Sequence, residues 1–155
     1  MSTISELTDK ADYIASKNKC LKIHWHTYSN SLTAAITQSN KKINHEFICG
    51  DGQDIRFMLF GYFIVRIQLS NDFYSQDIIY SINIAAPDQP DELRQFAHAS
   101  LGEDGRIDGS VDIRDRNAVL EHYLNNIATI YQCLFDSIHD NHSSYQQLRK
   151  LLDVA

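Results

Sequence analysis

Two pairs of closely spaced histidines are the first residues in this chain whose type suggests chemistry. His24 and His26 flank a tryptophan, whereas His139 and His142 lie three positions apart at the end of a predicted helix. Residues two apart on a helix point roughly 200° away from each other, so the first pair cannot share a metal ion. The second pair has a spacing that suits zinc, but no third ligand has a reason to lie near it. We therefore expect no bound metal and no cofactor.

An acidic run from residue 103 to residue 112 has the composition of a calcium-binding loop. An EF-hand loop needs oxygen ligands at its first, third and fifth positions and a glutamate at its twelfth. Counted from Asp104, the third position is Arg106 and the twelfth is Asp115. Because a cation would then stand where a calcium ligand belongs, we interpret this run as a solvated hairpin.

Cys49 lies near His45 and Glu46 in the sequence, as a catalytic nucleophile and its base could. This closeness specifies neither the geometry of a base nor an oxyanion hole. The motifs G-x-S-x-G and H-E-x-x-H and a phosphate-binding glycine loop do not occur in the sequence. The other cysteines, Cys20 and Cys133, are distant and complete no C-x-x-C motif, so we expect neither a disulfide framework nor a zinc knuckle. We predict that the protein is not an enzyme.

The overall composition is that of an ordinary globular domain. The chain has 155 residues, 43% hydrophobic and 22% charged, with only 6 Gly and 2 Pro. These values exclude a disordered or collagen-like chain, and the length suits a single domain over residues 1–155. No apolar run reaches the roughly 18 to 20 residues of a membrane helix, and the first residues lack the layout of a signal peptide. We expect a cytoplasmic protein that does not contact a membrane.

The distribution of charge argues against nucleic acid as a direct partner. The net charge is −6. Residues 1–50 carry a small positive excess, whereas residues 51–114 hold five Arg against eleven acidic residues. Binding to phosphates needs several Lys or Arg on one surface. Four of the six lysines of residues 1–50 would be scattered around a helix and would not line one stripe of it, so we expect no direct contact with DNA or RNA. These four are Lys10, Lys17, Lys19 and Lys22.

The first 45 or so residues contain neither Gly nor Pro, and their apolar residues recur in alternate steps of three and four, interrupted only by Asn18. This spacing predicts one long helix over about residues 3–44, either continuous or broken near Ser29-Asn30-Ser31. A continuous helix of this length would span roughly 60 Å, which exceeds the needs of one domain. Part of its apolar seam, the row of apolar residues along one side of the helix, should therefore pack against another surface, most simply that of a second copy in a homodimer. The seam consists of Ile4, Leu7, Ala11, Ile14, Leu21, Trp25, Tyr28, Leu32 and Ala35.

The pattern of residue types changes at Gly50-Asp51-Gly52. Beyond it, β-branched and aromatic residues alternate with polar ones, which predicts a sheet over about residues 55–113. The connections are too short for crossover helices, so five strands should form an antiparallel meander. The predicted strands are Ile55–Phe60, Tyr62–Leu69, Gln76–Ala85, Leu93–Leu101 and Arg106–Ile113.

A second long helix is predicted over about residues 115–140, with Asp115 as its N-cap. A short terminal helix should follow over about residues 145–152. Together these elements predict an α+β fold with a long helix on each side of the five-stranded antiparallel sheet. The apolar seam of the second helix is read as Leu120, Leu124, Ile127, Tyr131, Leu134 and Ile138.

Several segments of the chain carry a resemblance to one known family. These segments are Ala11-Asp12-Tyr13-Ile14-Ala15, Trp25-His26 with Tyr28, Asn30-Ser31-Leu32, Ile36-Thr37, Ile107-Asp108-Gly109 with Val111, Ile113-Arg114-Asp115-Arg116, Val119-Leu120-Glu121-His122-Tyr123-Leu124 and Ile127-Ala128. Together they resemble the formate hydrogenlyase regulatory protein HycA family of enteric bacteria. The likeness covers most of residues 5–138 and is most specific at its two ends.

The resemblance implies a negative regulator of formate hydrogenlyase gene expression. Such a protein would act by protein–protein contact against the formate-responsive transcription activator, and the family offers no catalytic residues to carry over. Two alternatives stay open. One is a repressor that binds DNA directly through the lysine-bearing first helix, and the other is a small-ligand sensor with a pocket between sheet and helices.

The junction between the predicted sheet and the second helix is our candidate partner interface. Arg114, Asp115 and Arg116 form a run of three charges that must be largely exposed, because burying unpaired charge is costly. Glu121 and His122 follow and lie off the apolar seam. The alternative interpretation assigns these residues to helix capping and a local ion pair.

Overall fold

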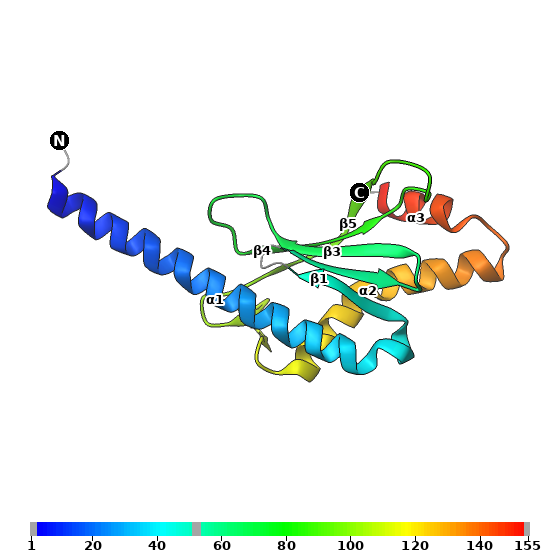
Figure 1. The fold of residues 1–155 in the computed structure, drawn as a ribbon, viewed down its shortest axis with the longest axis horizontal. Helices are drawn as coiled ribbons and strands as arrows, with labels where there is room; N and C mark the ends of the chain where they lie inside the picture. Colours follow the sequence, from blue (N-terminus) through cyan, green and yellow to red (C-terminus); the bar gives the residue numbers. More distant parts are fainter. Residues whose placement is uncertain (1–2, 51–53, 154–155) are drawn as a thin grey trace.

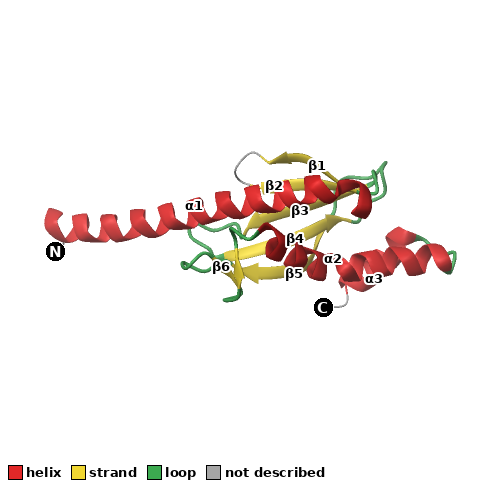
Figure 2. Cartoon of the chain, turned by 90° about the horizontal axis from the view of Figure 1, so that it is seen from below, coloured by secondary structure: helices red, strands yellow, loops and turns green. Residues whose placement is uncertain are grey.

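The computed structural model describes residues 3–50 and 54–153. Asp51 and Gly52 of the predicted helix-to-sheet boundary, and the side chain of Cys49, lie outside this description. A five-stranded antiparallel sheet runs in the order β1-β2-β3-β4-β5, and helices α1 and α2 pack against one of its faces (Figures 1 and 2). The elements are α1 (Ile4–Ile43), β1 (His45–Gly50), β2 (Asp54–Leu59), β3 (Phe63–Leu69), β4 (Asp77–Asn83), β5 (Leu93–Ser100), β6 (Arg106–Ile107), β7 (Val111–Asp112), α2 (Arg116–His139) and α3 (Ser144–Asp153).

Helix α1 is continuous, as the absence of Gly and Pro predicts, and does not break at residues 29–31. The Ser29 hydroxyl donates to the Trp25 carbonyl at 2.8 Å, so this serine is accommodated within the helix. At the far end, Asn44 adopts a φ of +53°, a left-handed conformation that asparagine tolerates. The chain thereby reverses direction and enters β1.

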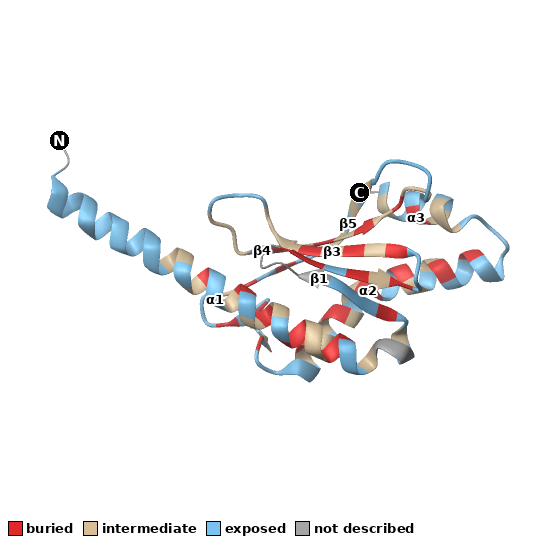
Figure 3. Ribbon diagram, in the orientation of Figure 1, coloured by how far each residue is buried: buried red, intermediate tan, exposed pale blue. Residues whose placement is uncertain are grey.

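Within one chain, the expected burial of the apolar seam from Ile4 to Ala35 is met only for its second part, and the first part, for which contact with a second copy was expected, is exposed. Its second part is buried against the sheet, with Trp25 as a central side chain. Ile4 is 85% exposed, Leu7 54% and Ile14 49% (Figure 3). The reason is length: strands of six to eight residues span roughly 20–27 Å, whereas α1 spans roughly 60 Å. The helix therefore projects beyond the sheet (Figure 1).

The strand assignment also needs correction at both ends of the sheet. The first edge strand is β1, which the sequence analysis did not predict. The predicted fifth strand, Arg106–Ile113, instead folds back on itself as the separate two-stranded β6/β7 hairpin. Asp108 and Gly109 have φ values of +53° and +75°, the left-handed pair that a tight hairpin turn requires.

Helix α2 begins as predicted, but its buried seam differs from the prediction. Leu120, Leu124 and Tyr131 are only half-buried, and Ile138 is 75% exposed. Apolar residues occupy two neighbouring stripes of this helix, so spacing alone did not identify the one that faces the core. The buried residues of α2 are Val119, Tyr123, Ile127, Ile130, Leu134 and Ser137.

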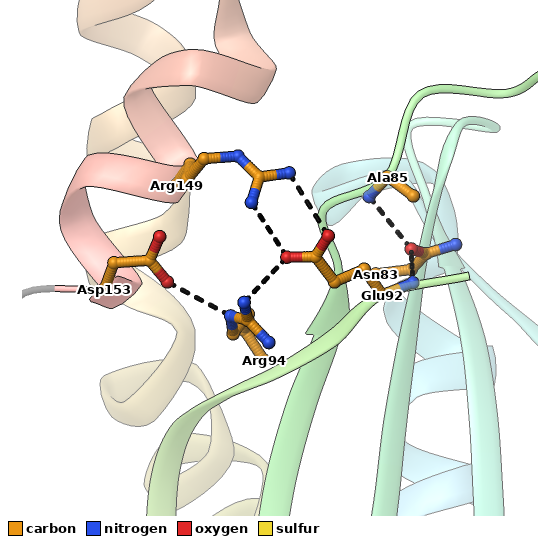
Figure 4. A network of polar contacts seen from close by, with 6 residues as sticks. All are labelled: Asn83, Ala85, Glu92, Arg94, Arg149 and Asp153. Carbon is orange, nitrogen blue, oxygen red and sulfur yellow. Dashed lines mark hydrogen bonds and ion pairs between the residues drawn. The ribbon is translucent and has the colours of Figure 1, made fainter. Parts of the chain in front are cut away.

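Helix α3 is attached to the sheet by both apolar and charged contacts. Leu148 is fully buried. Arg149 binds Glu92, which precedes β5, with Nη1 and Oε2 2.8 Å apart, and Arg94 bridges Glu92 to Asp153 (Figure 4). The short terminal helix thus packs beside the edge strand β5.

Candidate partner-binding surface

The turn from β7 into α2 holds the first three residues of the predicted interface. The backbone N–H of Arg114 donates to Asp112 Oδ1 at 2.9 Å, and that of Asp115 donates to the Asp112 carbonyl at 3.0 Å. The Asp115 carboxylate accepts from the backbone N–H of Ala118 at 3.2 Å, so Asp115 is the N-cap of α2. The turn is therefore rigid, while the side chains of Arg114, Asp115 and Arg116 are exposed.

His122 ties the first turns of α2 to the β6/β7 hairpin. Its side chain is half-buried, and its Nε2 lies 3.1 Å from Asp108 Oδ2. The other carboxylate oxygen of Asp108 accepts from the backbone N–H of Ser100 at 2.9 Å. Within the described residues, His122 Nδ1 is buried and has no hydrogen-bond partner. His122 is thus bonded within the fold, and less of its side chain is accessible to a partner than in the exposed residues Arg114, Arg116 and Glu121.

Arg114, Arg116 and Glu121 are the members of the predicted interface that remain free. All three are exposed, and no ion pair within residues 3–50 and 54–153 involves them. Arg114 lies in the hydrogen-bonded turn before α2, and Arg116 and Glu121 lie on the capped helix itself, so their backbones are held in place. Charged groups fixed in this way suit hydrogen bonds with the charged surface of another protein.

The histidines and acidic residues considered for metal binding lie apart. His24 Nε2 is 2.9 Å from the Glu103 carbonyl oxygen, whereas His26 is exposed. His139 Nδ1 is 3.6 Å from Asp140 Oδ1, and both side chains are exposed. In the described parts of the chain, no three His, Cys, Asp or Glu residues gather as a metal site would require.

An apolar groove is the surface feature that the sequence analysis missed. It has a volume of about 790 Å³ and lies between the second half of α2 and the turn that joins β2 to β3. Phe135 and Ile138 of α2 are 64% and 75% exposed on one side of it, and Phe60 and Tyr62 of the turn are exposed on the other. The 3–4 spacing of the second apolar stripe on α2 was the signal that could have indicated it. That stripe consists of Leu124, Ala128, Tyr131, Phe135 and Ile138.

The free helix, defined as residues 4–16 of α1, is the second exposed apolar feature. Every residue in it is exposed, and it projects away from the sheet (Figure 3). The first ion pair to the rest of the chain is made by Lys17 with Glu103, in the turn before β6. The seam residues of the free helix, Ile4, Leu7, Ala11 and Ile14, therefore face solvent.

Comparison with known proteins identifies the family. A family model described as "Transcriptional repressor of hyc and hyp operons" matches residues 2–149. The chain belongs to the HycA family. It is 42% identical over 139 residues to the formate hydrogenlyase regulatory protein HycA of Escherichia coli K12, covering 90% of this chain and 89% of that protein. The HycA proteins of Escherichia coli O157:H7 and Shigella flexneri match to the same extent. No solved structure matches.

This result confirms the resemblance noted from the sequence. The HycA family is one of transcriptional regulators, which agrees with the prediction that the chain is not an enzyme. Within the described residues, none of the helices is both long and apolar enough to cross a membrane.

Proposed function

We propose that this protein is a negative regulator of formate hydrogenlyase gene expression that acts by contact with the formate-responsive transcription activator. Membership of the HycA family supports the regulatory role. The mode of action rests on three exposed side chains, Arg114, Arg116 and Glu121, that make no ion pair within the described residues. We place this regulator, as one domain, in the cytoplasm, where its target genes are transcribed.

The lysines of α1 favour protein contact over DNA contact. Lys17 is paired with Glu103, and at 100° per residue Lys19 and Lys22 lie on the side of the helix away from Lys10 and Lys17. No face of α1 thus carries more than two of these lysines, which is few for phosphate binding. The net charge of −6 also opposes an approach to DNA.

The test is a triple variant in which Arg114, Arg116 and Glu121 are changed to Ala while Asp115 is kept. Because the cap is retained, thermal stability should be unchanged. We expect binding to the purified activator to fall at least tenfold and a formate-inducible reporter to be derepressed. The matched control is Lys19→Ala with Lys22→Ala, which removes exposed charges from α1 and should leave both readouts unchanged. Full repression by the folded triple variant would contradict the assignment of this surface.

The same control variant tests direct DNA binding. A DNA-binding repressor would bind its regulatory DNA in a gel shift, lose that binding steeply with added salt, and be weakened by the double lysine substitution. Our proposal expects no shift by the protein alone.

A polar hollow is the observation that favours a small-ligand sensor. It has a volume of about 790 Å³ and lies between α1 and the segment that follows β3. Lys22, His26 and Arg66 line it together with Asp72, and Arg66 is paired with Asp54. Lys22 makes no ion pair within the described residues, so it is the cation that would hold a small anion. Thermal shift with sodium formate against matched sodium chloride tests this alternative, since a bound ligand stabilises the folded state.

We further propose that the protein is a homodimer and that the free helix contributes to the interface. Four apolar side chains in water favour association, because covering them removes apolar surface from solvent. Sedimentation velocity at micromolar concentration tests the dimer. A strict monomer would contradict it.

A further inference from the structure

The free helix carries the first part of the apolar seam of α1, and the later part of the same seam packs against the core. From Ile4 to Ala35 the seam keeps one alternation of three and four residues, with Asn18 at its one polar position, and this is the spacing of helices that pack side by side. From Leu21 onward this seam is covered by the sheet and α2. Ile4, Leu7 and Ala11 of the same seam are exposed in the described chain, and Ile14 is 49% exposed beside Tyr74. The free helix is therefore built like a packing helix that lacks its partner surface.

The apolar groove lacks an occupant in the same way. Its lining contains no charged residue. One wall is the second stripe of α2, with apolar side chains in steps of four and three from Leu124 to Ile138, and the other wall is the aromatic pair Phe60 and Tyr62. A surface of this form accepts the apolar face of an amphipathic helix.

The stripe of the free helix is short enough to fit along the stripe of α2, but the two lie too far apart to meet within one chain. The stripe of the free helix spans roughly 15 Å, and that of α2 from Leu124 to Ile138 roughly 21 Å. The groove includes Ile43 at the end of α1, roughly 50 Å along the helix axis from the middle of the free stripe. In Figure 1 the free helix and the second half of α2 lie at opposite ends of the molecule. An occupant from this sequence must come from another copy.

We propose that the free helix of each copy binds in the apolar groove of a second copy, so that two antiparallel copies exchange their helices. A two-fold axis between such copies would satisfy both grooves and both free helices at once, which gives a closed dimer. This inference rests on the homodimer proposed above and specifies its interface. It is independent of the contact with the activator.

Crosslinking between two differently substituted copies tests the proposal. Leu7→Cys protein is mixed with Phe135→Cys protein, both in a background where Cys20, Cys49 and Cys133 are Ser, and treated with a short bismaleimide. We expect a covalent dimer in the mixture and at least tenfold less in either protein alone. Phe73→Cys is the matched control, since Phe73 is 73% exposed but lies on the segment between β3 and β4, outside the groove.

A charge substitution supplies a second measurement. Leu7→Asp and Phe135→Asp each change an exposed residue, so circular dichroism should show an unchanged fold. We expect each substitution to raise the dimer dissociation constant at least tenfold, because an unpaired carboxylate would enter an apolar contact.

The possible results test three proposals separately: the groove as the binding site, the homodimer, and the regulatory surface. Crosslinking of Leu7→Cys to itself, or to Phe73→Cys, in a stable dimer would overturn the groove as the binding site and leave the homodimer standing. A monomer at micromolar concentration would overturn both. The reporter assay of the triple variant decides the regulatory surface separately.

Discussion

His45 is a buried titratable residue whose two ring nitrogens both face tyrosine hydroxyls. Its Nε2 lies 2.6 Å from the Tyr123 hydroxyl and its Nδ1 3.0 Å from that of Tyr131. Because Tyr131 donates its own proton to the Ile43 carbonyl at 2.6 Å, it must accept from Nδ1–H, which leaves Tyr123 to donate to Nε2. The neutral ring is thus fully hydrogen-bonded. Burial lowers the pKa of His45 to about 4.

This pKa predicts a loss of stability in mild acid. Between pH 6.5 and 4 the unfolded chain binds a proton at His45 that the folded protein does not, so the free energy of unfolding falls as the pH falls. From pH 7 to pH 5 the loss should be about 2 kcal/mol. Urea unfolding at both pH values measures it. His45→Gln, which cannot titrate, is the control, and an equal pH dependence in both proteins would contradict the prediction.

At the scale of elements, α3 shows how apolar and charged contacts differ in their contribution to stability. Arg149 and Arg94 hold the pKa of Glu92 below its usual value, which reports a favourable but solvent-exposed network (Figure 4). Exposed ion pairs contribute little because water screens them. Leu148 of the same helix is fully buried.

We therefore predict unequal effects for two substitutions that loosen α3. Leu148→Ala should lower the free energy of unfolding by about 2 to 5 kcal/mol, because it leaves a cavity in the core. Glu92→Gln should leave global stability nearly unchanged and only speed amide hydrogen exchange in α3. Urea unfolding and hydrogen exchange measure the two effects. A larger loss of stability from Glu92→Gln than from Leu148→Ala would reverse the interpretation.

For the whole molecule, α1 provides a matched pair of leucines on one seam. Leu32 is fully buried, whereas Leu7 is 54% exposed. Leu32→Ala should cost about 2 to 5 kcal/mol of folding stability, and Leu7→Ala less than about 0.5 kcal/mol. Urea unfolding at a protein concentration below that of dimer formation measures both, so that association does not contribute. Similar costs would mean that the free helix packs against its own chain.

Local patterns in the sequence determined most elements of this fold. The length of α1 follows from 3–4 spacing without Gly or Pro, and the four strands β2 to β5 were predicted from the sequence pattern and its turn residues. The start of α2 follows from Asp115, whose carboxylate reaches a backbone N–H three residues on. These features depend on neighbours within about four residues, which a sequence displays directly. The exposure of Arg114 and Arg116 was predicted in the same way.

The tertiary structure decided which of several equivalent patterns is buried. The seam of α1 is regular from Ile4 to Ala35, and only the short strands of the sheet determine that its cover begins near Leu21. On α2 two stripes compete, and packing against α1 and the sheet buries the one that contains Tyr123. The apolar groove joins Phe60 to Phe135, far apart in the chain. Burial depends on partners distant in sequence, and periodicity along one helix carries no information about them.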